Sequence, residues 1–437
     1  MHRTRTCTLA LAGAVALAFA ACNDSPAPAA PAVRTNGANL NQLDNEGAVH
    51  FAGFVPLASS ASCTVSGGDP VNPLILPNGF AQTVVASEPD YITNGDMNAW
   101  NETGPQVGRF LYRPHETGPN SGVSVTDLVT GETRMIIRRQ DWSSLDGLVW
   151  TPWGTLLFAE EQGNTATNPD PDFPLATAGL VYELDPVSLV VAARPALGAR
   201  AHEGQVIDHN GNYYGISERN GGGIFKFVPD AKGDYSSGQL YVLKLTVDLG
   251  DRTGPGTWVA LDRAKSQINS DDEATAKSAT GYNRPEDLER WVSPDGKREV
   301  LYAALTGENR IIAIDISDPT GPVVKTLVKQ NVNAPADFTL PDNLAFDKFG
   351  NLFVTEDPGG SFPGKTIGDD IWMATLGADP AAAATAFPKF ASLTDCDAEP
   401  TGIIFDKTGT RLFVNIQHRG GDGLDKTLAI TRVPGSN

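Results

Sequence analysis

Acidic residues recur at one position of a repeated sequence pattern. Each copy starts with an acid, continues through an apolar run, a turn that holds glycine and a second apolar run, and ends in polar or acidic residues. Carboxylates that share one small space repel one another unless protons or cations neutralise them, and flexible carboxylate cages suit Ca²⁺. The leading acids of the five clear copies are Asp146, Glu203, Glu286, Asp342 and Glu399.

A second set of acids follows the second apolar run of several copies, at 160–161, 218 and 356–357. These acids could add oxygen ligands to the same ions. The alternative is that they are solvated loop acids, which is the ordinary role of an acid in a turn. Because the positions match from copy to copy, we favour a calcium site. The predicted metal ligands are Asp146, Glu160, Glu161, Glu203, Glu286, Asp342 and Glu399.

The repeat also predicts the elements that position these acids. The leading acids are 57, 83, 56 and 57 residues apart, and the long interval contains a polar insertion near 262–280. A unit of this length fits one four-stranded blade of a β-propeller. Residues 80–140 carry a weaker copy, which gives six units. We therefore predict an all-β, six-bladed β-propeller over 49–437 with an acidic central channel. A β-sandwich with a second domain is the rival, but sandwiches do not repeat at this period.

Composition limits the partners of this chain. The net charge is −19, and such a surface repels nucleic acid and attracts cations. We expect no nucleic-acid partner and a monomer.

The first residues predict export. Arg3 and Arg5 precede an apolar run that ends at Cys22, and this run is too short to span a bilayer as a stable helix. Cys22 follows two small residues, a pattern that resembles a bacterial lipobox. We predict a lipoprotein signal peptide over 1–21, lipidation of Cys22 and a Pro/Ala-rich tether over 22–48, with the membrane contacted only through the lipid. An ordinary signal peptide cut nearby is the alternative. The protein would lie on the periplasmic side of the outer membrane or on the cell surface.

Two cysteines remain after the signal. Cys63 and Cys396 form a lone pair, and such pairs usually form a bridge in an oxidising compartment. A disulfide would tie the start of the fold to its last repeat, where a circular fold must close. Two buried free thiols are the alternative.

Several short motifs lie at the same positions as the acids. They are Thr-Pro-Trp-Gly-Thr at 151–155 followed by Glu160 and Glu161, His-Glu-Gly at 202–204, Asn-Arg-Pro-Glu at 283–286, Pro-Asp-Asn at 341–343, Glu-Pro-Thr-Gly at 399–402 and Phe-Val-Asn-Ile-Gln-His at 413–418. Together they resemble the PhoX-type alkaline phosphatases, a family of exported bacterial propellers, over most of residues 140–420. The resemblance implies hydrolysis of phosphomonoesters at a cluster of calcium and iron in the channel.

One position departs from the family pattern. The best-known members have a cysteine directly before the Glu-Glu pair, and its thiolate bridges two irons; Ala159 stands there in this chain. The iron pair is therefore doubtful, whereas the carboxylates that could hold calcium are kept. Either this branch uses a cluster with oxygen ligands alone or it has lost the activity.

A phosphomonoester dianion can enter an acidic channel only where metals and a cation attract it. Arg284 is the predicted cation, because a guanidinium can bind two phosphate oxygens at once. Metal ions would polarise the phosphoryl group and lower the pKa of bound water. His202 would hydrogen-bond the leaving group or brace Glu203, and we favour bracing. A structural ion pair of Arg284 with Glu286 or Asp287 is the alternative to phosphate binding.

The predicted function is that of an exported, calcium-dependent, PhoX-like phosphatase that acts on small phosphorylated substrates. Two alternatives stay open, because propellers host many functions. One is a calcium-dependent lactonase or esterase on the same scaffold. The other is a binding propeller that calcium stabilises and that catalyses nothing.

Overall fold

Strands make up most of the molecule. The computed structural model describes residues 51–433 except 52, 66–67, 164–169, 358–363 and 420–423. The predicted signal peptide, Cys22 and the tether lie outside the described residues. Residues Asp44–Asn437 form one compact unit. Within the described part of the chain, every helix is too short or too polar to span a bilayer.

Four antiparallel sheets of four or five strands stand as separate blades. The first contains β3 (Ala99–Trp100), β4 (Phe110–Pro114), β5 (Gly122–Asp127) and β6 (Thr133–Arg138). The second contains β7 (Leu145–Trp150), β8 (Leu156–Glu160), β9 (Val181–Leu184) and β10 (Val191–Ala193). The third contains β22 (Pro341–Phe346), β23 (Asn351–Glu356), β24 (Asp370–Thr375), β25 (Lys389–Leu393) and β1 (Leu74–Ile75). The fourth contains β26 (Glu399–Phe405), β27 (Arg411–Gln417), β28 (Lys426–Arg432) and β2 (Phe80–Ser87).

A fifth sheet is continuous over nine strands. Its order is β11 (His202–Ile207), β12 (Tyr213–Ser217), β14 (Ile224–Ala231), β15 (Asp234–Leu245), β16 (Gly254–Ala260), β21 (Val323–Lys329), β20 (Arg310–Asp315), β19 (Glu299–Leu305) and β18 (Pro285–Val292). The all-β, propeller-like fold is thus confirmed, but the prediction of six separate blades is wrong. The reason is β16, which pairs with β15 on one side and with β21 at Gly254 and Pro255 on the other.

The helices and a short ribbon lie in the long interval of the repeat, and two 3₁₀ turns lie on either side of it. Two short helices, α2 (Arg263–Ile268) and α3 (Ser270–Ala276), occupy the polar insertion, and Asp262 and Asn269 cap their N-termini. A two-stranded ribbon joins β13 (Asn220–Gly222) to β17 (Tyr282–Asn283), and two 3₁₀ turns span Pro195–Leu197 and Thr306–Glu308.

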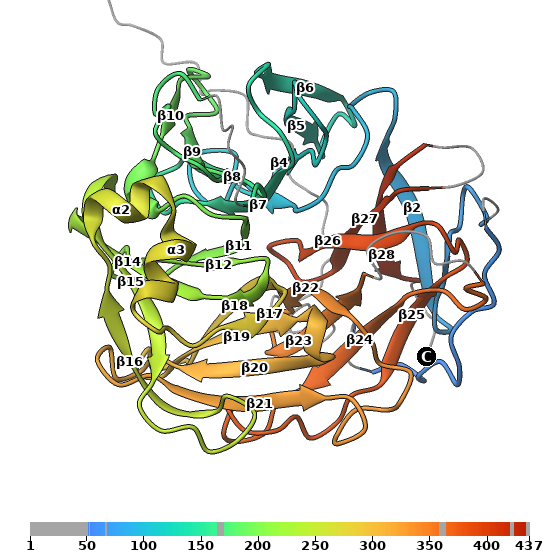
Figure 1. The fold of residues 1–437 in the computed structure, drawn as a ribbon. Coiled ribbons are helices and arrows are strands. Elements are labelled where there is room, and N and C mark those ends of the chain that lie inside the picture. The colour runs from blue at the N-terminus through green and yellow to red at the C-terminus, as the bar shows by residue number, and fades with distance from the viewer. Residues whose placement is uncertain are drawn as a thin grey trace, which may run out of the picture. The chain divides into compact units, whose positions relative to one another are not determined.

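The sheets follow one another around a common centre, with β7, β11, β18, β22 and β26 nearest to it (Figure 1). At the centre, hydrogen bonds that involve side chains connect these inner strands to one another and to the segment before β3. We call these hydrogen bonds the cross-strand ties. Each tie is one hydrogen bond between neighbouring units of the ring, and at least one of its two atoms belongs to a side chain. The ties run from Asn98 Nδ2 to Gly402 O, from Thr401 Oγ1 to Asn343 Oδ1, from Leu344 N to Asp287 Oδ2 and from Gln205 Nε2 to Gly147 O.

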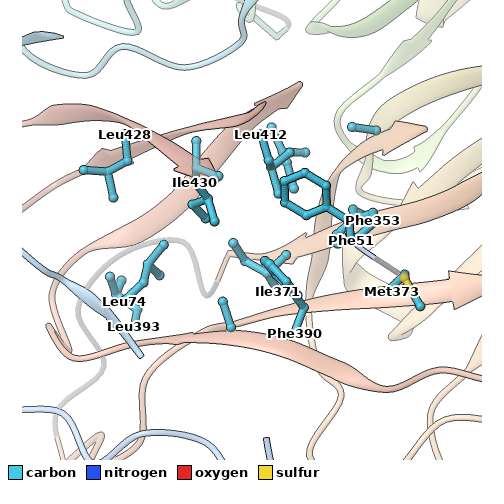
Figure 2. Close-up of a cluster of buried hydrophobic side chains, with 14 of the residues drawn as sticks. Phe51, Leu74, Phe353, Ile371, Met373, Phe390, Leu393, Leu412, Leu428 and Ile430 are labelled. Atoms are coloured by element: carbon cyan, nitrogen blue, oxygen red, sulfur yellow. The ribbon is translucent and has the colours of Figure 1, made fainter. Parts of the chain in front are cut away.

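The two ends of the described chain close the ring of sheets. β2 pairs with β28, from Phe80 opposite Arg432 to Ser87 opposite Lys426, so the first long strand completes the last blade. Cys63 and Cys396 are joined by a disulfide with 5.1 Å between the Cα atoms. Phe51 packs between the last two blades, with its ring 5.0 Å from that of Phe405 and 6.1 Å from that of Phe353 (Figure 2).

Phe51 is 1 % exposed, and its ring also contacts those of Phe80 and Phe390. We predict that Phe51→Ala lowers the free energy of unfolding by about 3 to 5 kcal/mol, because it leaves a cavity in this core cluster. Chemical denaturation measures the change. Val55→Ala, at a side chain that is 77 % exposed four residues later, is the control and is expected to leave the midpoint unchanged. Equal midpoints for Phe51→Ala and wild type would contradict this packing.

Candidate metal centre

Twelve residues line a cavity of about 290 Å³ where the inner strands begin. Ten of them are carboxylic acids, and the other two are an arginine and a histidine. We call this space the acidic cavity. Its lining residues are Asp96, Glu116, Asp146, Glu161, Glu203, Glu218, Arg284, Glu286, Asp342, Asp357, Glu399 and His418.

Six of the acids stand at or just before the start of a strand near the centre, one for each of the five inner strands and one before β3. We call them the inner acids: Asp96, Asp146, Glu203, Glu286, Asp342 and Glu399. All six are between 3 % and 7 % exposed. Because the six strands start around one centre, acids that are far apart in sequence converge on one small volume.

Four further acids follow the second strand of a unit, and we call them the outer acids. In each of these units the backbone N–H of the outer acid donates to the carbonyl two residues before the inner acid. The same bond in the unit of β18 starts from a threonine. The pairs are Glu116 N to Asn94 O at 2.7 Å, Glu161 N to Ser144 O at 2.8 Å, Glu218 N to Ala201 O at 3.0 Å, Thr306 N to Arg284 O at 2.9 Å and Asp357 N to Leu340 O at 3.0 Å.

The residue that accepts this bond is in the left-handed conformation in four of the units. The φ angles are 53° at Asn94, 45° at Ser144, 46° at Arg284 and 47° at Leu340. Residues other than glycine, asparagine and aspartate rarely adopt this conformation, and such strain is concentrated at functional sites. The recurrence of one strained residue two positions before an inner acid indicates that the backbone is built to aim these carboxylates inward.

Two groups of three carboxylates are close enough to share a metal ion. Asp96, Glu116 and Asp146 each offer an oxygen within 4.8 Å of the others, and so do Asp146, Glu161 and Glu203. Asp146 belongs to both groups, so one carboxylate could bridge two neighbouring cations. All the donors are hard oxygens, which suit Ca²⁺ better than a soft metal.

Burial raises the pKa of every inner acid, and the neighbouring carboxylates raise it further. The outer acid Glu116 shows the same causes: burial first, then Asp96 and Asp357, raise its pKa to about 8. A group of acids that resists ionisation to this extent binds protons at neutral pH unless a cation takes their place.

Arg284 is the one arginine or lysine among the lining residues, and its side chain is 34 % exposed. Its Nε lies 2.6 Å from Glu218 Oε1 and its Nη2 lies 3.0 Å from Glu286 Oε1. Burial alone would lower the pKa of Arg284, but Glu286 and Glu218 raise it above the ordinary value. The guanidinium is therefore a permanent positive charge in the wall of the acidic cavity.

Two predicted site residues do not line the cavity. The buried ring of His202 points elsewhere, with Nε2 2.9 Å from Gly198 O, and burial, then Arg200, lowers its pKa well below the ordinary value. Glu160 accepts from Ser143 N at 3.2 Å and from Tyr182 Oη at 3.1 Å. Successive residues of a strand point to opposite faces, so Glu203 and Glu161 enter the cavity while their preceding neighbours turn away. Neither His202 nor Glu160 is therefore among the residues that line the acidic cavity.

Glu356 is likewise directed away from the cavity. Its Oε1 accepts from Trp372 Nε1 at 2.9 Å and its Oε2 from Asp370 N at 3.0 Å, whereas the next residue, Asp357, lines the cavity. This is the alternation seen at Glu160 and Glu161.

Five lining residues are absent from the predicted site: Glu218 and Asp357, considered only as a second set of ligands, and Asp96, Glu116 and His418, which were missed. Asp96 lies three residues before β3, whereas the other inner acids are the first or second residue of their strands, and its copy of the repeat is weak. Glu116 follows β4, but it lies 20 residues after Asp96, whereas the other outer acids lie 15 residues after their inner acids, so the spacing of the repeat does not identify it. His418 belongs to a quoted motif without an assigned role, and its Nε2 lies 3.5 Å from Glu399 Oε1.

We predict that the metal-free protein loses stability as the pH rises. Folded Glu116 keeps its proton up to a pKa of about 8, whereas in the unfolded chain it ionises near the ordinary value of about 4.3. Between these values the folded state binds more protons, so the free energy of unfolding falls with rising pH. Thermal unfolding in a chelating buffer measures this slope, and added Ca²⁺ should flatten it.

Glu116→Gln should reduce that slope, while Glu132→Gln, at an exposed residue of the same blade, is the control. A melting temperature that rises with pH in the chelated wild type would contradict this electrostatic description.

Comparison with solved structures finds matches of low sequence identity. Among solved structures, a luciferin-regenerating enzyme is 14 % identical with a TM-score of 0.46, covering 82 % of this chain and 96 % of its own. The β-propeller domain of Cps50 (Swd1) from Myceliophteria thermophila is 12 % identical with a TM-score of 0.43, covering 80 % and 99 %. A putative 6-phosphogluconolactonase from Bacteroides uniformis is 15 % identical with a TM-score of 0.41, covering 71 % and 77 %. Comparison with curated proteins gives no match.

A family model gives the more specific result. The model described as alkaline phosphatase PhoX matches residues 149–322 and 320–420, more than half of the chain. These ranges contain the inner strands β11, β18, β22 and β26 in full, the end of β7, and most of the acids that line the acidic cavity. This chain belongs to the PhoX alkaline phosphatase family.

Proposed function

We propose that this protein is an exported, calcium-dependent phosphatase that hydrolyses small phosphomonoesters in the acidic cavity. The observation that carries the proposal is the combination of ten carboxylates and one arginine around a single cavity of about 290 Å³. The carboxylates suit cations, and the guanidinium of Arg284 suits an anion. A phosphomonoester bound to metal ions requires both.

The residues present fit calcium. Asp96, Glu116, Asp146, Glu161 and Glu203 supply the two overlapping oxygen groups that would hold it. When bound, calcium supplies positive charge that polarises the phosphoryl group and lowers the pKa of a bound water. The fit to an iron pair is poorer, because none of the lining residues is a cysteine and Cys63 and Cys396 are held in a disulfide.

Arg284 has the position for substrate binding. It already contacts two carboxylates, and its planar fork of donors can hold phosphate oxygens bidentately. The pairs with Glu218 and Glu286 fix the guanidinium in one orientation, which reduces the entropy lost when the substrate binds. We assign Arg284 to binding the phosphoryl oxygens and stabilising the charge that they carry in the transition state.

His418 is the second non-acidic group in the wall. Its exposed ring lies beside Glu399, on the same cavity as Arg284, and it can donate a hydrogen bond to a leaving-group oxygen. We assign to His418 a hydrogen bond to the leaving group, which is the less favoured of the two roles considered for His202.

Location and assembly complete the proposal. The signal peptide, the lipid on Cys22 and the tether would place the propeller on the periplasmic side of the outer membrane or on the cell surface, where it acts as a monomer. A lactonase or esterase, or a calcium-binding propeller without catalysis, remains as an outcome of the test below.

We predict that purified protein hydrolyses p-nitrophenyl phosphate, that a chelator abolishes turnover and that Ca²⁺ restores it. Arg284→Ala should lower kcat/KM by about 10- to 100-fold, the loss expected for a hydrogen bond to a charged group. Metal analysis should find calcium in the wild type and less of it in Asp146→Asn, which removes the carboxylate that both oxygen groups share.

Arg219→Ala is the matched control. The backbone carbonyl of Arg219 accepts from Arg284 N at 3.1 Å, but its guanidinium contacts Asp271 at 3.6 Å and does not line the acidic cavity. Activity that persists in chelator and in Arg284→Ala would refute the mechanism. Bound calcium without turnover of phosphomonoesters would favour the binding propeller, and calcium-dependent turnover of lactones or carboxylic esters alone would favour the other hydrolase.

A further inference from the structure

A second cavity lies further along the same inner strands. It has a volume of about 340 Å³, and none of its described lining residues also lines the acidic cavity. We call it the far cavity. On β18, for example, Glu286 faces the acidic cavity, whereas Asp287 and Glu289 line the far cavity. The cross-strand ties at the centre, such as that from Asn98 to Gly402, involve residues at this level of the strands.

Two buried amide oxygens in its wall lack a partner. Asn98 is 7 % exposed and Gln205 is 4 % exposed. Their amide nitrogens donate to the carbonyls of Gly402 and Gly147, which fixes the orientation of both amides. Asn98 Oδ1 and Gln205 Oε1 accept no hydrogen bond from any residue that the structure describes. Burying a hydrogen-bond acceptor without a donor lowers the stability of the folded state. A bound donor or cation would remove this cost for the two oxygens.

Carboxylates stand in the same wall. Asp287 is held in place by Leu288 N, 2.6 Å from Oδ1, and by Leu344 N, 2.8 Å from Oδ2. Glu289 lies two residues further along β18 and accepts from Arg290 N at 3.0 Å. Burial, then Asp287, raises the pKa of Glu289 to about 8, as expected for two acids close together with little solvent.

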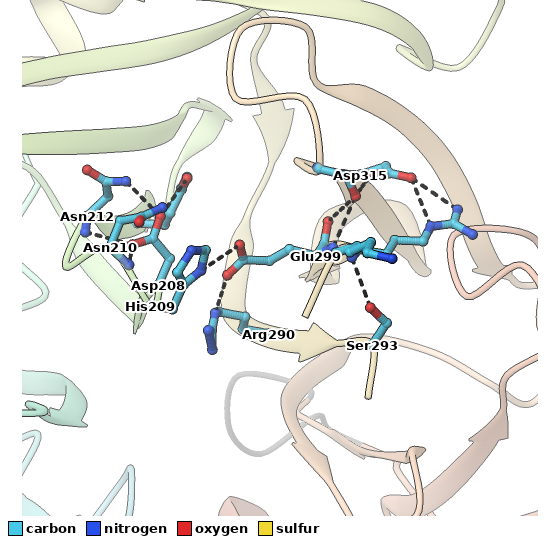
Figure 3. Close-up of polar contacts among 12 residues, drawn as sticks. Asp208, His209, Asn210, Asn212, Arg290, Ser293, Glu299 and Asp315 are labelled. Atoms are coloured by element: carbon cyan, nitrogen blue, oxygen red, sulfur yellow. Dashed lines mark hydrogen bonds and ion pairs between the residues drawn. The ribbon is translucent and has the colours of Figure 1, made fainter. Parts of the chain in front are cut away.

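The basic groups of the far cavity are already engaged. Arg290 Nε lies 2.5 Å from Glu299 Oε1, and His209 Nδ1 lies 3.5 Å from Glu299 Oε2 (Figure 3). Glu299 does not line the cavity, so it draws both basic groups away from the acids that do. Asp208, the neighbouring acid in Figure 3, is satisfied by Asn210 N and by Asn212. Among the described residues, no ion pair joins a basic group to Asp287 or Glu289, although the charge of Arg290 still acts to lower the pKa of Glu289.

We propose that the far cavity is a second calcium site, with ligands from Asp287, Glu289 and the amide oxygens of Asn98 and Gln205. Carboxylate and amide oxygens are the ligands that Ca²⁺ takes in proteins. The four side chains come from three different inner strands or the segment before them, so an ion here would join the units at their centre. This site does not depend on the phosphatase activity of the acidic cavity.

The test uses Tb³⁺, a luminescent substitute for Ca²⁺ that is excited by energy transfer from a nearby tryptophan. Trp150 lines the far cavity, whereas none of the residues that line the acidic cavity is a tryptophan, tyrosine or phenylalanine. Tb³⁺ in the far cavity should therefore emit on tryptophan excitation. We expect this emission from the full chain after its metals are removed by chelation, and we expect Ca²⁺ to compete it away.

Three variants decide the outcome. Glu289→Gln, which removes a charge and keeps the shape, should weaken the Tb³⁺ affinity read from this emission by about tenfold or more. Asp295→Asn, in the exposed hairpin that follows β18, is the control and should leave the affinity unchanged. Asp146→Asn, which damages the acidic cavity alone, should also leave the emission in place.

Two results would overturn the proposal. One is an emission titration for Glu289→Gln that matches the wild type. The other is loss of the emission in Asp146→Asn, which would place the ion in the acidic cavity. If Glu289→Gln does not fold, the result for Asp146→Asn still decides the test. Neither result involves turnover, so a failed far site and a failed phosphatase are told apart.

Discussion

Repulsion among carboxylates is the constraint on which the rest of this structure depends. Ten acids share a cavity of about 290 Å³, and burial together with their mutual repulsion raises the pKa of each inner acid. Removing one negative charge from such a set lowers the repulsion among the remaining carboxylates. The convergence of the acids does not itself stabilise the fold. A cation that bridges them, as Asp146 is placed to do between two neighbouring groups, converts this cost into binding free energy.

The backbone is built to withstand that repulsion. Below the acids, Gly402 approaches the neighbouring unit so closely that a Cβ there would lie about 2.1 Å from Asp96 O, and its φ of 56° suits glycine. Asn343 and Thr401 bond across the junction on the other side of β26, with β22. Ser144 and Leu340 accept strained left-handed conformations beside the inner acids. These features hold the inner strands closer than their charges alone would allow.

The sequence predicted the convergence well because the period of the repeat reports the circular arrangement directly. Asp146, Glu203, Glu286, Asp342 and Glu399 were found from that period alone, and all of them line the acidic cavity. The direction of each side chain is harder to predict from the sequence. Adjacent acids such as Glu160 and Glu161 point to opposite faces of the strand, and the residue at which a strand ends is not visible in the sequence. The nine-stranded sheet was missed because the pairing of β16 with β21 joins segments of different units and leaves no periodic signal.

The departures from repetition indicate where an anion can enter. Thr306 stands where the other units around it have an outer acid, and Arg284 occupies the space beside it. In the unit of β26, His418 follows the second strand in place of an acid. These two units flank the unit of β22, which contributes Asp357. Among the lining residues, every group able to carry positive charge therefore lies on one arc of the ring, while the two oxygen groups around Asp146 lie on the other. A phosphate dianion held between the arcs would meet cations on both sides, which is the arrangement that phosphoryl transfer requires.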